Sequence, residues 1–232
     1  MQNKVGQLVA ILILLCASRA YGDITRVYHP YVEQHEREIE YGFVLRDAGH
    51  ANVVLNRAGV GYAWTDKFFS EIYVLTESIT HDNKQIRGYE AEFKWQLTEQ
   101  GEYWADWGLL IEVANAKDIE SSEVAAGLLW EKELTNRWVT TANLFIEYEF
   151  GDDIQDELES AFRGQIRYRN NPAFDTGFEI YIDDQDRALG PAIMGTVKLS
   201  GRKQLRWELG VLIGIDSKTP DTNLRGGLEF EF

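Results

Sequence analysis

The sequence is poor in cysteine, in proline and in long hydrophobic runs. Its 232 residues contain one cysteine and four prolines. The cysteine, Cys16, falls in a short apolar run near the N-terminus, so the rest of the chain can form no internal disulfide. After that run, no stretch approaches the ~20 apolar residues that a transmembrane helix needs. Any membrane crossing must therefore use β-strands, which satisfy their backbone hydrogen bonds in a closed barrel.

Basic residues are scarce relative to acidic ones. The chain carries 23 Lys and Arg against 38 Asp and Glu, a formal net charge of −15. This excess of negative charge argues against a nucleic-acid partner, because phosphate backbones attract basic surfaces. Glycine patterns that cradle phosphates and cysteine spacings that hold metals are also missing from the sequence. The sequence therefore predicts no cofactor and no metal site.

The first twenty residues have the parts of a secretory signal peptide. Lys4 lies in a short basic start, and an apolar run follows from Leu8 to Ala17. The run is too short to span a bilayer of ~30 Å. Small residues around Ala20 provide a cleavage site, and cleavage after Gly22 fits nearly as well. We expect three segments: a signal peptide at 1–20, a polar periplasmic lead-in at 21–37 and a β-barrel domain at 38–232.

The last ten residues alternate between an apolar and a polar face. Leu228, Phe230 and Phe232 point one way, while Glu229 and Glu231 point the other. A chain that ends on Phe after such a strand resembles the assembly signal of Gram-negative outer-membrane β-barrels. The resemblance implies that Leu228, Phe230 and Phe232 are recognised by the barrel assembly machinery. It also implies a location in the cell outer membrane, in contact with its lipid.

The same period of two recurs along the chain before that strand. Twelve segments alternate, and prolines fall outside them or at their first residues, as a hydrogen-bonded sheet requires. We therefore predict an all-β fold, an antiparallel transmembrane β-barrel of about 12 strands with both termini in the periplasm. The apolar, outward positions of the twelve segments span 39–45, 58–64, 68–74, 89–95, 103–113, 124–130, 138–148, 162–168, 176–182, 193–199, 205–215 and 224–232.

A soluble periplasmic β-protein that binds a ligand would alternate too, and two features favour the membrane. Connections expected to be short face longer or more acidic ones at 47–56, 78–87 and 151–158. Outward aromatic residues also gather at the strand ends beside the short turns, as in the aromatic girdle of a membrane protein. These residues are Trp64, Phe68, Trp95, Tyr103, Trp130, Trp138, Tyr168, Trp207, Phe230 and Phe232.

The inward positions carry most of the charge. They predict a lumen that is acidic on one half and mixed on the other, and charged walls select which ions enter a pore. The chain is then a porin-like channel or binding barrel for small polar or cationic solutes. Alternatively, the charges pair and seal a structural or adhesive barrel, for example through Glu179 beside Arg163 or Arg167. The candidate lumen residues are Glu71, Glu90, Glu92, Lys94, Glu112, Glu131, Glu147, Arg163, Arg167, Glu179, Arg206 and Arg225.

No catalytic constellation emerges from the sequence. Twelve-stranded outer-membrane phospholipases carry a histidine closely followed by a serine. Here His50 is followed by Ala51 and Asn52, and His81 is followed by acidic and amide residues, so the resemblance to that family fails at the catalytic residues. We therefore predict that the chain is not an enzyme.

Overall fold

The computed structural model describes residues 26–47, 52–79, 84–117 and 119–232. The predicted signal peptide at 1–20, His50 and His81 lie outside these ranges. The described residues contain no helix long and apolar enough to cross a membrane.

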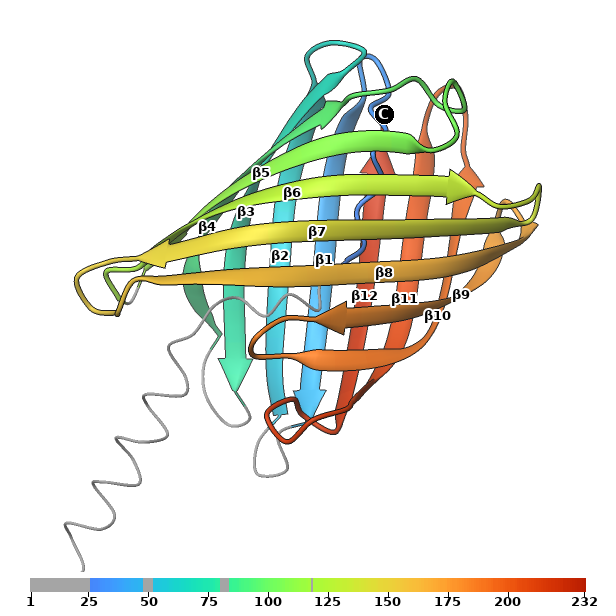
Figure 1. Ribbon diagram of the computed structural model, residues 1–232. Helices are drawn as coiled ribbons and strands as arrows, with labels where there is room; N and C mark the ends of the chain where they lie inside the picture. The colour runs from blue at the N-terminus through green and yellow to red at the C-terminus, as the bar shows by residue number, and fades with distance from the viewer. Residues whose placement is uncertain (1–25, 48–51, 80–83, 118) are drawn as a thin grey trace, which may run out of the picture.

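The chain folds into a closed antiparallel barrel of twelve strands (Figure 1). Each strand pairs with its neighbours in sequence, and β1 pairs with β12 to close the barrel. The predicted fold class and strand count are confirmed. The strands are β1 (Arg37–Asp47), β2 (Asn52–Ala63), β3 (Phe68–Ile79), β4 (Gln85–Gln96), β5 (Asp106–Ala116), β6 (Ser122–Glu133), β7 (Trp138–Phe150), β8 (Glu157–Asn171), β9 (Phe174–Ile182), β10 (Arg187–Lys198), β11 (Gln204–Gly214) and β12 (Thr222–Glu231).

Burial alternates along each strand, with the apolar residues outside. In β1, Glu38 and Glu40 are 5% exposed, whereas Ile39 and Tyr41 are 53% and 42% exposed. Around the barrel most charged strand residues lie inside and most large apolar ones outside, the reverse of a water-soluble protein. A few apolar residues, such as Leu110 and Phe145, lie inside. An apolar outer band is what a lipid-facing barrel presents.

The two rims of the barrel differ less than the sequence suggested. The turn rim carries the connections 64–67, 97–105, 134–137, 172–173 and 199–203; the loop rim carries 48–51, 80–84, 117–121, 151–156, 183–186 and 215–221. Strands extend into the stretches expected to be long loops at 47–56 and 78–87. Conversely, Tyr103, expected in a strand, lies in the connection 97–105. Which rim faces the periplasm stays a prediction.

Aromatic side chains pair along the turn rim. Phe68 stacks on Trp95 with ring centroids 4.8 Å apart, and Trp138 meets Tyr168 edge-on at 4.9 Å. Trp104, which the sequence analysis did not include, contacts the rings of two neighbouring tryptophans. Such a belt of amphipathic rings suits a membrane–water interface.

The N-terminal segment 26–36, called the plug below, enters the lumen from the turn rim. Tyr28 is 2% exposed and packs in a cluster with Leu110, Leu129 and Phe145, side chains of three strands. Val27 and Val32 join two further buried clusters inside the barrel. The sequence analysis placed 21–37 ahead of the barrel and missed this insertion. The interior of the barrel is therefore built around its own N-terminal segment.

Candidate functional site: the plugged lumen

Two side-chain amides of the wall hold the backbone of the plug. The Tyr28 N–H donates to Asn143 Oδ1 at 2.8 Å, and Asn143 Nδ2 donates to the Tyr28 carbonyl oxygen at 2.9 Å. The Val32 N–H donates to Gln96 Oε1 at 2.8 Å. Buried backbone groups need such partners, because an unpaired one costs free energy. The amides on β7 and β4 thus replace the neighbouring strand that the plug lacks.

Side chains of the plug bind carboxylates on the wall. The Tyr28 hydroxyl donates to Glu92 Oε1 at 2.6 Å, and the Tyr31 hydroxyl donates to Asp106 Oδ2 at 2.8 Å. His29 Nδ1 contacts Glu131, which also accepts from the Tyr31 hydroxyl at 3.1 Å. Burial and the nearby charges of Glu131 and Asp106 raise the pKa of Tyr31, so its phenol remains a donor. These contacts give buried carboxylates on the acidic half of the wall hydrogen-bond donors from the plug.

A glycine makes room for the plug at one point of the wall. A Cβ added at Gly108 on β5 would lie 3.0 Å from both Cα and Cβ of Pro30. A side chain there would push against the plug backbone, so this close approach depends on glycine.

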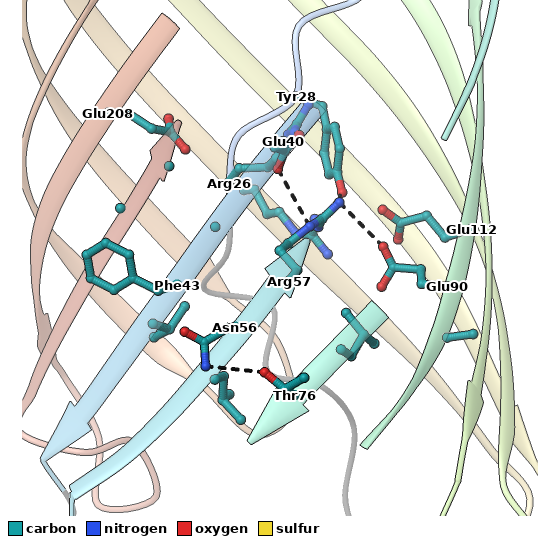
Figure 2. A pocket seen from close by; sticks show the side chains of 18 of the residues that line it. Arg26, Tyr28, Glu40, Phe43, Asn56, Arg57, Thr76, Glu90, Glu112 and Glu208 are labelled. Carbon is teal, nitrogen blue, oxygen red and sulfur yellow. Dashed lines mark hydrogen bonds and ion pairs between the residues drawn. The ribbon is translucent and has the colours of Figure 1, made fainter. Parts of the chain in front are cut away.

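Arg57 on β2 is the hub of one charge network (Figure 2). Its guanidinium lies 2.5 Å from Glu92, 3.5 Å from Glu90 and 3.7 Å from Glu40. Its carbon Cζ also lies 3.8 Å from the centroid of the Tyr73 ring. Its Nη2 donates to Glu92 Oε1, whereas its Nε has no hydrogen-bond partner among the described residues. The plug adds a further cation, because Arg26 pairs with Glu40.

Arg225 on β12 is the hub of a second network. Its Nε donates to Glu179 Oε2 at 2.7 Å while Nη2 binds the other oxygen, and Nη1 lies 2.7 Å from Glu208. Gln165 Nε2 donates to Glu179 at 2.8 Å. Arg225 and Glu179 are both fully buried. Breaking such a pair leaves an uncompensated charge, so this network holds β12 to β9 and β11 across the lumen.

The expected partners of Glu179 were wrong. We expected Arg163 or Arg167 beside it, whereas it pairs with Arg225 across β9 and β12. Arg163 instead lies over the Phe145 ring at 4.3 Å and 3.9 Å from Glu147. Arg167 is half-buried on the inward side of β8.

The other candidate lumen residues lie on the inward side as well. Lys94 sits 5.0 Å over the Phe69 ring. Arg206 pairs with Glu229 at 3.2 Å and Glu231 at 2.6 Å. Glu71 lies in a group of carboxylates, and Glu112 lines a cavity, both described below. The structure thus distributes the twelve candidates over several networks and gathers no single site from them.

The sequence analysis missed several residues of these networks. Arg57 could have been found, because its neighbour Ala58 was placed on the outer face and strand alternation then turns Arg57 inward. Asn143 on β7 follows from the same alternation. Arg26 and Tyr28 lie in a segment without strand or helix periodicity, so their entry into the lumen could not be predicted from the sequence.

A cavity of about 70 Å³ lies beside Arg26 and Tyr28 (Figure 2). Its charged lining consists of three arginines and a larger number of glutamates. Cations and zwitterions with an exposed ammonium group are favoured by such an excess of carboxylates. The charged lining residues are Arg26, Arg57, Arg163, Glu40, Glu90, Glu112, Glu123 and Glu208.

No protein-family model and no curated protein matches the sequence. Solved structures do match the fold. The KdgM porin in complex with disordered oligogalacturonate superposes with a TM-score of 0.58 at 11% identity, over 84% of this chain and 99% of that one. The chain has the fold of outer-membrane porins.

Two further solved structures support the same conclusion. An outer-membrane channel from Pseudomonas putida F1 matches with a TM-score of 0.56 at 14% identity, over 92% of this chain and 99% of that one. The NanC porin matches with a TM-score of 0.51 at 11% identity, over 84% and 98%. At identities this low the similarity supports the barrel architecture only. The role of the residues in the lumen must therefore be inferred from this chain itself.

Proposed function

We propose that the protein is an outer-membrane channel for small cationic or zwitterionic solutes, and that the structure is its closed form. The observation that carries this proposal is the plug, whose Tyr28 is held in the lumen by Asn143 and Glu92. A barrel of this architecture with its lumen filled by a terminal segment conducts only when that segment moves.

The plug is attached to the wall by contacts that are individually modest. A hydrogen bond contributes about 0.5–1.5 kcal/mol net to stability, because the groups bind water when they separate. The hydroxyl, imidazole and carboxylate groups of the plug contacts are polar and can be hydrated in an open lumen. Release therefore leaves few apolar groups in water, chiefly Val27, Val32 and the Tyr28 ring.

The wall supplies the preference for cations. Five glutamates, among them Glu90, Glu112 and Glu123, line the cavity beside the plug together with three arginines. Charged groups in a narrow pore raise the barrier to ions of like charge. A solute with an ammonium group can bind these carboxylates, whereas an anion meets repulsion.

The membrane location and the partners belong to the same proposal. The apolar outer band would contact outer-membrane lipid, and the aromatic belt would lie at one interface. Phe232 ends the chain on the outer face, and its N–H donates to the Arg37 carbonyl at 2.9 Å beside the β1–β12 seam. We propose that Leu228, Phe230 and Phe232 are presented to the barrel assembly machinery before this seam closes.

The test is conductance in planar bilayers with purified full-length mature protein. We expect brief openings of the wild type in symmetric salt and a reversal potential that favours cations in a salt gradient. Asn143→Leu, which removes both backbone contacts to Tyr28 without changing the charge, should lengthen the openings. If neither protein conducts and neither gives solute flux in liposomes, the channel proposal is overturned in favour of a sealed barrel.

A further inference from the structure

Three neighbouring strands bring two glutamates together over a glycine. Glu38 on β1 and Glu71 on β3 are both register partners of Gly61 on β2. A Cβ on Gly61 would lie 2.6 Å from Glu71 Cγ and 2.9 Å from Glu38 Cγ. The two acidic side chains therefore converge in the space that the missing side chain leaves.

A third carboxylate completes the group. Oxygen atoms of Glu38, Glu40 and Glu71 lie within 4.8 Å of one another, and all three residues are at most 5% exposed. Glu40 accepts from the Tyr73 hydroxyl at 2.9 Å and pairs with Arg26. The three carboxylates thus face one another rather than solvent.

A buried oxygen atom of Glu71 points to a ligand. Its Oε1 is buried, and no hydrogen-bond partner for it exists among the described residues. In the described part of the chain neither Glu38 nor Glu71 has a basic nitrogen within 4.0 Å, although Glu40 has two arginines. Buried carboxylates normally pair or bind a metal, because an isolated buried charge is costly.

We propose that Glu38, Glu40 and Glu71 form a divalent-cation site of calcium size on the lumen wall. Calcium binds oxygens at about 2.3–2.6 Å, so oxygens on opposite sides of the ion lie roughly 4.6–5.2 Å apart. The three carboxylates each offer an oxygen within 4.8 Å of the others, close enough for one ion of this size to bind all three. Magnesium demands near-ideal octahedral geometry and gives up its waters reluctantly, so three buried carboxylates suit it less well.

Charge favours a divalent ion over a lysine ammonium at this place. Lys94 lies over the Phe69 ring and makes no ion pair with the three glutamates among the described contacts. A divalent ion would neutralise Glu38 and Glu71, neither of which forms an ion pair within 4.0 Å among the described residues. Lumen water would fill the remaining coordination positions, because calcium takes six to eight oxygen ligands. The site requires only the closed barrel and does not depend on channel activity.

The experiment uses terbium as a luminescent calcium probe on the purified mature protein in detergent. Tyr73, whose hydroxyl binds Glu40, lies close enough to sensitise terbium emission. We expect saturable emission with one terbium per protein, displaced by calcium and at least tenfold less readily by magnesium. Glu71→Gln should weaken terbium binding at least tenfold. Glu77→Gln, which removes one carboxylate from the loop-rim end of the same strand, should leave binding unchanged.

Two further measurements test the site in case Glu71→Gln does not fold. Glu38→Gln removes a carboxylate of the same group from a different strand, so it should weaken terbium binding as well. Calcium should also raise the unfolding temperature of the wild type saturably above its value in EDTA at equal ionic strength. Absence of saturable terbium emission from folded wild type would overturn the site, as would equal binding by Glu71→Gln and Glu77→Gln. In that case the two glutamates share a proton instead.

Discussion

Tyr28 and Asn143 exchange two hydrogen bonds inside the barrel, one in each direction. The backbone N–H of Tyr28 donates to the side chain of Asn143, which donates back to the Tyr28 carbonyl. These residues lie 115 positions apart in the chain. One wall side chain thus satisfies both backbone groups of a residue that has no strand beside it.

The first prediction concerns the strength of this anchor. Asn143→Leu leaves two backbone groups of Tyr28 without partners, at a cost of about 1–3 kcal/mol for each. The population with a displaced plug should rise about tenfold or more, since ~1.4 kcal/mol is a factor of ten. Limited trypsin digestion should then cleave after Arg26, and N-terminal sequencing should detect a chain starting at Val27.

Asn115→Leu is the control for this digestion. Asn115 is exposed near the loop rim, and its amide binds Ser121 and Ser122 without contacting the plug. Its cleavage rate at Arg26 should equal that of the wild type. Equal rates for all three proteins would mean that Asn143 does not hold the plug.

The second prediction tests which face meets lipid. Leu209 lies at the middle of β11 on the outer face, and Val197 lies near the end of β10 on the same face. Leu209→Arg should lower the free energy of unfolding by ~2–4 kcal/mol, and Val197→Arg by only ~0–1 kcal/mol, because the cost of a lipid-facing arginine depends on depth. Denaturant titration in lipid vesicles measures both. A soluble sheet would show small and similar effects at the two sites.

The third prediction concerns the buried pair of Arg225 and Glu179. Arg225→Met leaves Glu179 as an unpaired buried charge, and unfolding free energy should fall by about 3–5 kcal/mol. The double variant Arg225→Met/Glu179→Met should recover much of that loss, because it removes both charges. The exposed pair of Arg169 and Glu133, 2.7 Å apart, is the comparison, and Arg169→Met should cost less than ~1 kcal/mol. A double variant no better than the single one would contradict the pairing argument.

The fourth prediction concerns ion selectivity. Replacing Glu112 and Glu123 with Gln removes two carboxylates from the cavity lining and should lower the cation-over-anion permeability ratio without abolishing conductance. Raising the salt should weaken the wild-type preference, since the screening length falls from ~10 Å at 0.1 M to ~3 Å at 1 M. Glu133→Gln at the exposed turn rim should leave the ratio unchanged. An unchanged ratio in the double variant would remove these two residues from the permeation path.

The alternation of apolar and polar residues along the strands predicted most of the fold. A side-chain period of two places Ile39 outside and Glu40 inside, and the same rule assigns inward faces correctly wherever a strand is regular. The rule says nothing about which inward charges pair, because pairing depends on strand register and side-chain reach. Glu179 therefore pairs with Arg225 rather than with an arginine on β8.

The insertion of the plug into the lumen could not be predicted from the sequence. Tyr28 and Val32 lie in a short polar segment without helical or strand period, so no pattern distinguishes insertion from a free lead-in. Their partners Asn143 and Gln96 are single amides, which are as common on a hydrated wall as in an anchor. The insertion depends on tertiary fit, as at Gly108, where the missing side chain admits Pro30.

A reversible cross-link between the plug and the wall tests whether the plug closes the channel. Pro30→Cys and Gly108→Cys would place their Cβ atoms about 3.0 Å apart, and a shift of roughly 0.5 Å reaches the ~3.5–4.5 Å of a disulfide. The predicted mature chain, without Cys16, has no cysteine of its own to interfere. Each single cysteine variant serves as a control that cannot cross-link within the chain.

The measurement is single-channel conductance of the double cysteine variant before and after reduction. We expect no conductance from the oxidised form and openings after reductant is added. Both single variants should open, and their openings should not respond to reductant. Equal conductance of the double variant in its oxidised and reduced forms, with the cross-link verified by mass spectrometry, would contradict the claim that this segment closes the channel.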